Sequence, residues 1–180
     1  MGQTGCLHAP RSRIRREVVI STRRHLQYAA GFLDLGMIPD AAKELDAIVR
    51  ADRDAPEVLT VQIDLHMQAK QWKPVCAVAA KLVRAEPGND KGWISWAFAL
   101  RELGRIEKAR QVLIEALPLH EKTCDVLHYN LACYECLLGN LPEALDYLSV
   151  AMQRDQHWKE EAIDDPDLEA LWPEIAKMKG

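Results

Sequence analysis

A repeat of 34 to 35 residues is the feature that most constrains the fold of this chain. Similar residues recur in five columns that share steps of 34, 34 and 35 residues, and the first column is Ala29, Ile63, Ala97 and Ala132. The other columns are Gly36, Lys70, Gly104, Gly139; Ala41, Val75, Ala109, Ala144; Leu45, Ala79, Leu113, Leu148; and Ile48, Leu82, Ala116, Ala151. We therefore divide the chain into repeats 22–55, 56–89, 90–124 and 125–158, with a basic, flexible arm at 1–21 and a capping segment at 159–180.

Each repeat predicts a hairpin of two helices. In the third, apolar residues recur at helical spacing on both sides of Gly104, first Trp93, Trp96, Ala97 and Leu100 and then Ala109, Val112, Leu113 and Ala116. The pattern predicts turns at Gly36–Pro39, Lys70–Lys73, Gly104–Ile106 and Gly139–Leu141. Because Lys70 lacks the left-handed freedom of glycine, we expect the second turn to be the least regular. The expected fold is all-α.

These residues resemble the tetratricopeptide repeat family, whose 34-residue hairpins follow a Trp, Leu-Gly, Tyr, Gly, Ala, Phe, Ala, Pro pattern. The best matches lie in the third and fourth repeats, at Trp93, Trp96-Ala97, Leu100, Gly104, Ala109, Leu113 and Ala116, and at Leu131-Ala132, Gly139, Ala144, Leu148 and Ala151. The resemblance implies a right-handed superhelical α-solenoid of stacked hairpins with a concave face lined by the first helices. The tail Asp164–Glu169 also resembles those of many bacterial members.

A stack of hairpins needs a cap at its exposed end, and residues 159–180 predict one. Asp165-Pro166 is a strong helix start, with Asp165 as the N-cap and Pro166 in the first turn. Leu168, Leu171 and Trp172 then share one face, which we expect to cover the last hairpin. The same residues could instead fold into the concave groove.

The charge distribution argues against nucleic acid binding by the folded part. Residues 1–24 hold six arginines and the single acidic residue Glu17, which leaves 17 basic and 26 acidic side chains in residues 25–180. A phosphate-binding surface needs a basic face. RNA or membrane-surface association through the arginine-rich arm remains an alternative. The lack of an apolar run of about 20 residues indicates a cytoplasmic protein without a membrane span.

The sequence contains no catalytic motif, so we expect no enzymatic activity and no cofactor. Cys133 and Cys136 share the spacing of a metal or redox pair, but a structural zinc site needs four ligands and no second pair follows. We therefore predict reduced, metal-free thiols.

The expected function is noncatalytic recognition of a protein or peptide partner in the concave groove, as an adaptor or scaffold. A secretion-type chaperone for an exported partner is an alternative, and a homo-oligomer is compatible with the pattern. Helical spacing places an apolar stripe with charged edges on the first helices. The predicted groove residues are Asp64, Met67, Lys91, Ile94, Phe98, Arg101, Tyr129, Cys133, Cys136 and Leu137.

Overall fold

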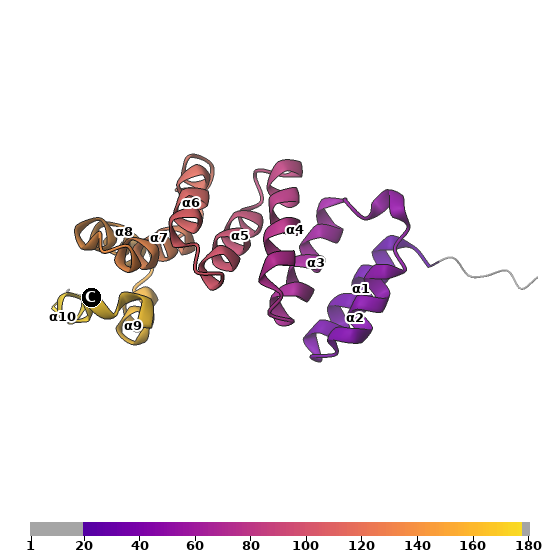
Figure 1. Ribbon diagram of the computed structural model, residues 1–180, viewed down its shortest axis with the longest axis horizontal. Helices are drawn as coiled ribbons and strands as arrows, with labels where there is room; N and C mark the ends of the chain where they lie inside the picture. Colours follow the sequence, from indigo (N-terminus) through magenta and orange to yellow (C-terminus); the bar gives the residue numbers. More distant parts are fainter. Residues whose placement is uncertain (1–19, 178–180) are drawn as a thin grey trace, which may run out of the picture.

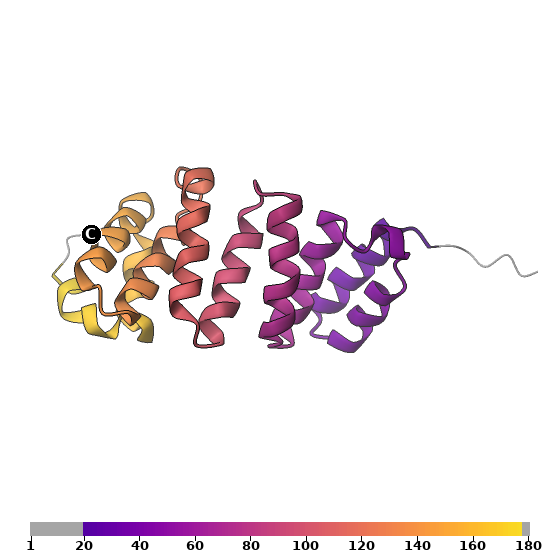
Figure 2. The same ribbon diagram turned by 45° about the horizontal axis from the view of Figure 1, so that its top comes forward.

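The computed structural model describes residues 20–177, and within them all regular structure is helical, which confirms the all-α prediction. The predicted basic arm lies outside these residues except for its last two positions. No helix in the described range is long and apolar enough to cross a bilayer. The helices form successive hairpins in an elongated row (Figures 1 and 2).

The hairpins pair consecutive helices, and each hairpin falls within one of the four expected repeats. A short 3-10 helix, η1 (Arg50–Asp52), leads from the first hairpin to the second. The helices are α1 (Thr22–Asp34) with α2 (Ile38–Asp46), α3 (Pro56–Gln68) with α4 (Trp72–Ala85), α5 (Asp90–Glu102) with α6 (Ile106–His120), and α7 (Val126–Leu137) with α8 (Leu141–Arg154).

The four hairpin turns share one backbone geometry. Gly36, Gly104 and Gly139 have φ values of 71°, 69° and 82°, and Lys70 at the equivalent position has a φ of 53°. The residue after each donates its backbone N–H to a carbonyl five residues earlier, at 2.8 to 2.9 Å. The expectation of an irregular second turn was therefore wrong. The turn's hydrogen bonds hold Lys70 in the left-handed region although its side chain disfavours it.

The first helices of the hairpins form one continuous layer, which we call the inner layer: α1, α3, α5 and α7. Within it, α1 contacts α3, α3 contacts α5, and α5 contacts α7. Small residues permit this close packing, since Ala29, Ala97 and Ala132 are fully buried. Each second helix packs on its own first helix, and α2, α4 and α6 also pack on the first helix of the next hairpin. The result is a solenoid of stacked hairpins (Figure 2).

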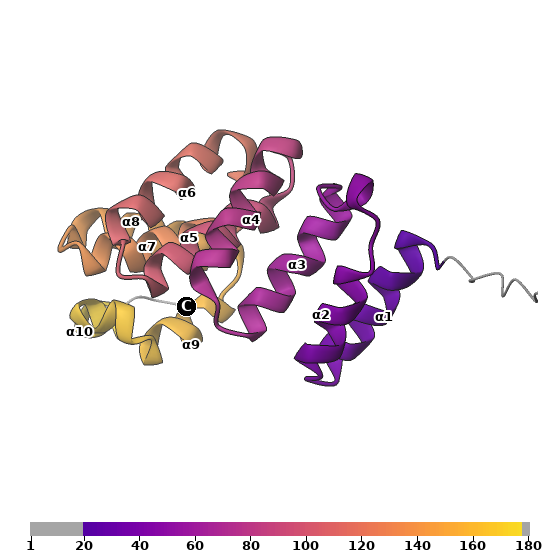
Figure 3. The same cartoon turned by 45° about the vertical axis from the view of Figure 1, so that its right-hand side comes forward.

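The C-terminal segment turns back onto the last hairpin as α9 (His157–Asp164), the 3-10 helix η2 (Pro166–Leu171) and α10 (Trp172–Ile175) (Figures 1 and 3). Asp165 is the N-cap of η2, as predicted, and its carboxylate accepts a hydrogen bond from the Asp167 N–H at 2.9 Å. The helix that follows is 3-10 instead of α.

The expected buried face is correct for Leu168 and Leu171 but wrong for Trp172, which is 37% exposed. Residues three apart share a side of a 3-10 helix, so Leu168 and Leu171 align while Trp172 points away. Ile175 extends the buried row into α10 and is also fully buried.

Candidate interaction face

Four of the predicted groove residues lie on α3 and the first half of α5. Asp64 and Lys91 form an ion pair between these helices, with the Lys91 ammonium 2.6 Å from a carboxylate oxygen of Asp64. Met67 and Ile94 are half-buried and pack against the core. These two charged members of the predicted groove therefore neutralise each other.

Phe98 is the most exposed aromatic residue among the predicted groove residues, at 36%. Its ring meets that of Trp72 edge-on, with a centroid distance of 5.8 Å and an interplanar angle of 70°. It also lines a pocket of about 210 Å³ between α5, α7 and the C-terminal segment, beside Arg101 and Asn130. Phe98 is thus held in place on one side and open on the other.

Arg101 reaches across the inner face to the C-terminal segment. Its guanidinium makes a two-pronged contact with the Asp167 carboxylate, in which Nε donates to Oδ2 at 2.8 Å and Nη2 donates to Oδ1. Nη1 donates to Glu102 at 2.5 Å. The hydrogen bonds to Asp167 raise the pKa of Arg101 further above its already high ordinary value. This cation is therefore engaged by the chain itself.

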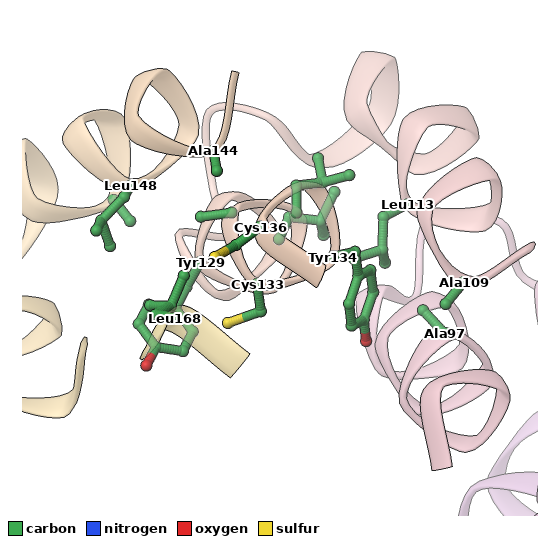
Figure 4. Packing of buried hydrophobic residues seen from close by; sticks show 14 of the residues in the cluster. Ala97, Ala109, Leu113, Tyr129, Cys133, Tyr134, Cys136, Ala144, Leu148 and Leu168 are labelled. Carbon is green, nitrogen blue, oxygen red and sulfur yellow. The ribbon is translucent and has the colours of Figure 1, made fainter. Parts of the chain in front are cut away.

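Tyr129 and Cys133 lie beneath the same segment. The Tyr129 hydroxyl donates to Asp165 Oδ2 at 2.8 Å, and its ring stacks on Trp158 with a centroid distance of 4.5 Å. The Cys133 thiol donates to the same oxygen at 3.5 Å. Figure 4 shows Tyr129, Cys133 and Leu168 together on one side of α7. Burial raises the pKa of both Tyr129 and Cys133, which keeps them protonated donors.

The remaining two predicted residues separate in the structure. Cys136 is buried, and burial raises the pKa of its thiol, whereas Leu137 at the end of α7 is 44% exposed. Cys133 and Cys136 are free thiols. Among residues 20–177 no three Cys, His, Asp or Glu side chains are grouped so as to hold a metal ion. The reduced, metal-free state of these thiols stays a prediction.

The N-terminal half of the inner layer carries an open groove of about 720 Å³ between α1 and α3. Its exposed wall is mostly apolar, and Arg23 and Glu57 add charges from the first turns of α1 and α3. Its lining residues are Thr22, Arg23, Leu26, Gln27, Ala30, Asp52, Ala55, Glu57 and Val61. None of these residues is among the predicted groove residues.

Sequence reasoning missed the residues that cover the C-terminal half of the face: Trp158, Asp165 and Asp167. Trp158 donates from its indole nitrogen to Asp125 at 2.8 Å, which lowers the pKa of that carboxyl. The sequence indicated only a helix start at Asp165 and assigned no role to Asp167. Their partners lie 36 and 66 residues away in the chain, and no local pattern encodes such pairings.

Comparison with known proteins identifies the fold. No protein-family model matches the chain, and no curated sequence matches significantly. Solved structures of MamA, a tetratricopeptide repeat protein, are similar to it. One MamA crystal structure aligns with a TM-score of 0.72 over 87% of this chain and 86% of its own, at 14% identity.

The fold is a tetratricopeptide repeat solenoid. Two further MamA structures share this tetratricopeptide repeat fold. The RS-1 double mutant has a TM-score of 0.69 and 16% identity over 84% of this chain and 82% of its own. The MSR-1 structure has a TM-score of 0.66 and 21% identity over 77% of this chain and 79% of its own. At these identities the likeness concerns the fold alone, so the inner face has to be interpreted from its own residues.

Proposed function

We propose that this protein is a noncatalytic interaction module that binds a segment of a partner protein along its inner layer. The observation that carries this proposal is the open groove of about 720 Å³ between α1 and α3, whose floor includes Leu26 and Val61. A concave apolar surface of this size is costly to leave in water and suits an extended or helical segment. Arg23 and Glu57, from the first turns of α1 and α3, supply charges for orientation.

A noncatalytic role is supported by how the polar groups of the face are used. Asp64 pairs with Lys91, and Arg101 pairs with Asp167. The thiols of Cys133 and Cys136 are buried and have raised pKa values, which disfavours the reactive thiolate. Side chains whose charges are neutralised in ion pairs are poorly suited to proton transfer, so this face is better suited to binding than to catalysis.

The structure changes which groove residues suit a test of partner binding. Tyr129 is 7% exposed and holds Asp165, so its replacement would disturb the fold. Leu26 and Val61 line the open groove and are only partly buried against the core cluster of α1, α2 and α3, so circular dichroism has to show that their variant is folded. The matched control is Leu119, which is 56% exposed on α6, outside the inner layer.

The experiment compares Leu26→Glu/Val61→Glu with Leu119→Glu. Proteins captured by the tagged wild-type chain from its native organism are identified, and the affinity of each purified candidate is measured by calorimetry. We expect the groove variant to bind at least about tenfold more weakly, because a buried carboxylate replaces an apolar contact. Leu119→Glu should bind like the wild type. Equal affinity in both variants, or turnover of a substrate, would contradict the proposal.

The capture also separates the remaining alternatives. An exported protein as the partner would favour the secretion-type chaperone. The RNA or membrane-surface alternative depends on an arm that lies almost wholly outside the described residues, and the groove variant should leave it unaffected.

A further inference from the structure

The C-terminal segment lies where the groove prediction placed a partner. Arg101, Tyr129, Cys133 and Cys136 were all predicted to contact a bound segment, and each is covered by or bonded to residues 165–171. η2 contacts α7 more extensively than α8, so it lies along the inner layer instead of simply continuing the stack. Figure 3 shows this yellow segment running beneath α5 and α7.

The contacts combine two kinds of recognition. Asp165 receives the Tyr129 hydroxyl and the Cys133 thiol, while Asp167 receives the Arg101 guanidinium from the neighbouring hairpin. Together these bonds fix two carboxylates that are separated in the sequence by one residue, Pro166. Leu168 follows directly and is fully buried in the core cluster that contains α7 residues. Charge-assisted bonds at fixed spacing supply specificity, and the leucine supplies apolar contact.

The segment is organised for binding by its own bonds. Asp165 uses one carboxylate oxygen to accept the Asp167 N–H, which closes the turn at Pro166, and the other to accept from α7. A turn that is already shaped loses less conformational entropy when it docks. The sequence Asp-Pro-Asp-Leu is therefore a compact recognition element.

Building on the proposed function, we propose that residues 165–168 are an internal ligand of the inner face. The surface formed by Arg101, Tyr129 and Cys133 recognises a partner segment of the same chemistry. Such a segment has two acidic residues with one residue between them, followed directly by leucine. Such a segment competes with the chain's own tail. The C-terminal half of the face is thus selective for acidic turns, whereas the N-terminal groove is open.

The test uses the full chain with its tail released and a labelled synthetic peptide of residues 163–177. Leu168→Asp places a charge in a fully buried position and undocks the tail without altering Arg101 or Tyr129. Glu169→Ala, at an exposed neighbouring position, is the matched control. Binding is measured by fluorescence anisotropy, and folding is checked by circular dichroism.

We expect the peptide to bind Leu168→Asp at least about a hundredfold more tightly than wild type or Glu169→Ala, because a tethered tail competes at millimolar effective concentration. A peptide with Asp165→Asn and Asp167→Asn should not bind. Leu168→Asp/Arg101→Glu should lose the peptide and recover binding to a peptide carrying Asp167→Arg. A folded Leu168→Asp protein that ignores the peptide would overturn the proposal and leave the segment as a structural cap.

Two further measurements complete the test, the first of them on the unaltered chain. If Leu168→Asp does not fold, hydrogen exchange decides: amides of 168–171 should exchange at least about tenfold faster than those of 127–134, and equal protection would refute a displaceable tail. Sedimentation compares the wild-type chain with Asp167→Arg. We expect no wild-type dimer that is lost in the variant. Such a dimer would assign the face to the tail of a second copy instead of a separate partner.

The peptide experiment needs no natural partner, so its failure leaves the general binding role standing. Equal partner affinity of Leu26→Glu/Val61→Glu and the Leu119→Glu control would refute the proposed function, while the peptide result could still hold.

Discussion

At the scale of single residues, Lys70 shows that the hydrogen bonds of a turn can override the backbone preference of the residue in it. Its φ of 53° lies in the left-handed region, which costs an L residue about 1 kcal/mol. Lys70→Gly removes this strain at the expense of a more flexible unfolded chain. We expect a net gain of about 0.5 kcal/mol in the free energy of unfolding, measured by urea denaturation.

The reverse substitution is the control for Lys70. Gly104 has a φ of 69°, and a Cβ there would meet nothing within 4 Å. Gly104→Ala should therefore lose about 1 kcal/mol from backbone strain alone. The changes in the free energy of unfolding should have opposite signs in the two variants. A loss of stability in Lys70→Gly would show that the lysine side chain contributes more stability than its backbone strain removes.

Another residue, His128, should make stability depend on pH. It is 3% exposed, its Nδ1 has no hydrogen-bond partner within residues 20–177, and burial together with the Arg154 charge lowers its pKa. A lowered folded-state pKa contributes stability above the unfolded value of about 6.5, and this stability is lost as the pH falls below it. We expect His128→Leu to reduce the drop in Tm between pH 7.5 and 5.5.

His157 on α9, whose side chain is 54% exposed, supplies the comparison for His128. His157→Gln should retain the wild-type dependence of Tm on pH. An unchanged slope in His128→Leu would assign the pH dependence to other groups.

At the scale of elements, helices α6 and α7 are joined by a buried carboxylate. Glu135 is 1% exposed, and its carboxylate accepts hydrogen bonds from Arg110 Nε at 2.5 Å and from Asn140 at 2.7 Å. Removing Arg110 leaves the charge with one donor. Because the Arg110 side chain is 37% exposed, water can partly replace it, and we expect Arg110→Met to cost about 2 kcal/mol.

A double-mutant cycle measures that coupling between Arg110 and Glu135. Arg110→Met/Glu135→Leu should be more stable than Arg110→Met alone, because an apolar pair leaves no buried charge unmatched. Additive losses in thermal or urea unfolding would contradict a coupled pair.

The sequence predicts the helices of the hairpins well and the C-terminal segment poorly, for a physical reason. Hairpin packing repeats every 34 to 35 residues, so residues such as Ala97 and Ala132 mark each contact in turn. Arg101 and Asp167 meet once, across 66 residues, and leave no periodic trace. Hence helical spacing predicts which residues share the inner layer, but not the division of that layer into a covered and an open half.

At the scale of the whole molecule, the solenoid is asymmetric. One large core cluster joins the third and fourth hairpins to the C-terminal segment, whereas α1, α2 and part of α3 share a small cluster of their own. In a stacked-repeat protein each hairpin is stabilised mainly by its neighbours. Within residues 20–177 the first hairpin has a neighbouring hairpin on one side only, so we expect it to open before the rest.

Two leucine truncations test this order of unfolding. Leu45 on α2 belongs to the small cluster, and Leu148 on α8 belongs to the large one; both are at least 95% buried. Leu→Ala in a core costs about 2–5 kcal/mol, which exceeds what a terminal hairpin can absorb. We expect Leu45→Ala to accelerate hydrogen exchange in 22–46 while the main melting transition stays near the wild-type Tm. Leu148→Ala should lower that transition. Equal shifts of one transition in both variants would mean that the hairpins unfold as a single unit, and a groove between α1 and α3 would then be as rigid as the rest of the inner layer.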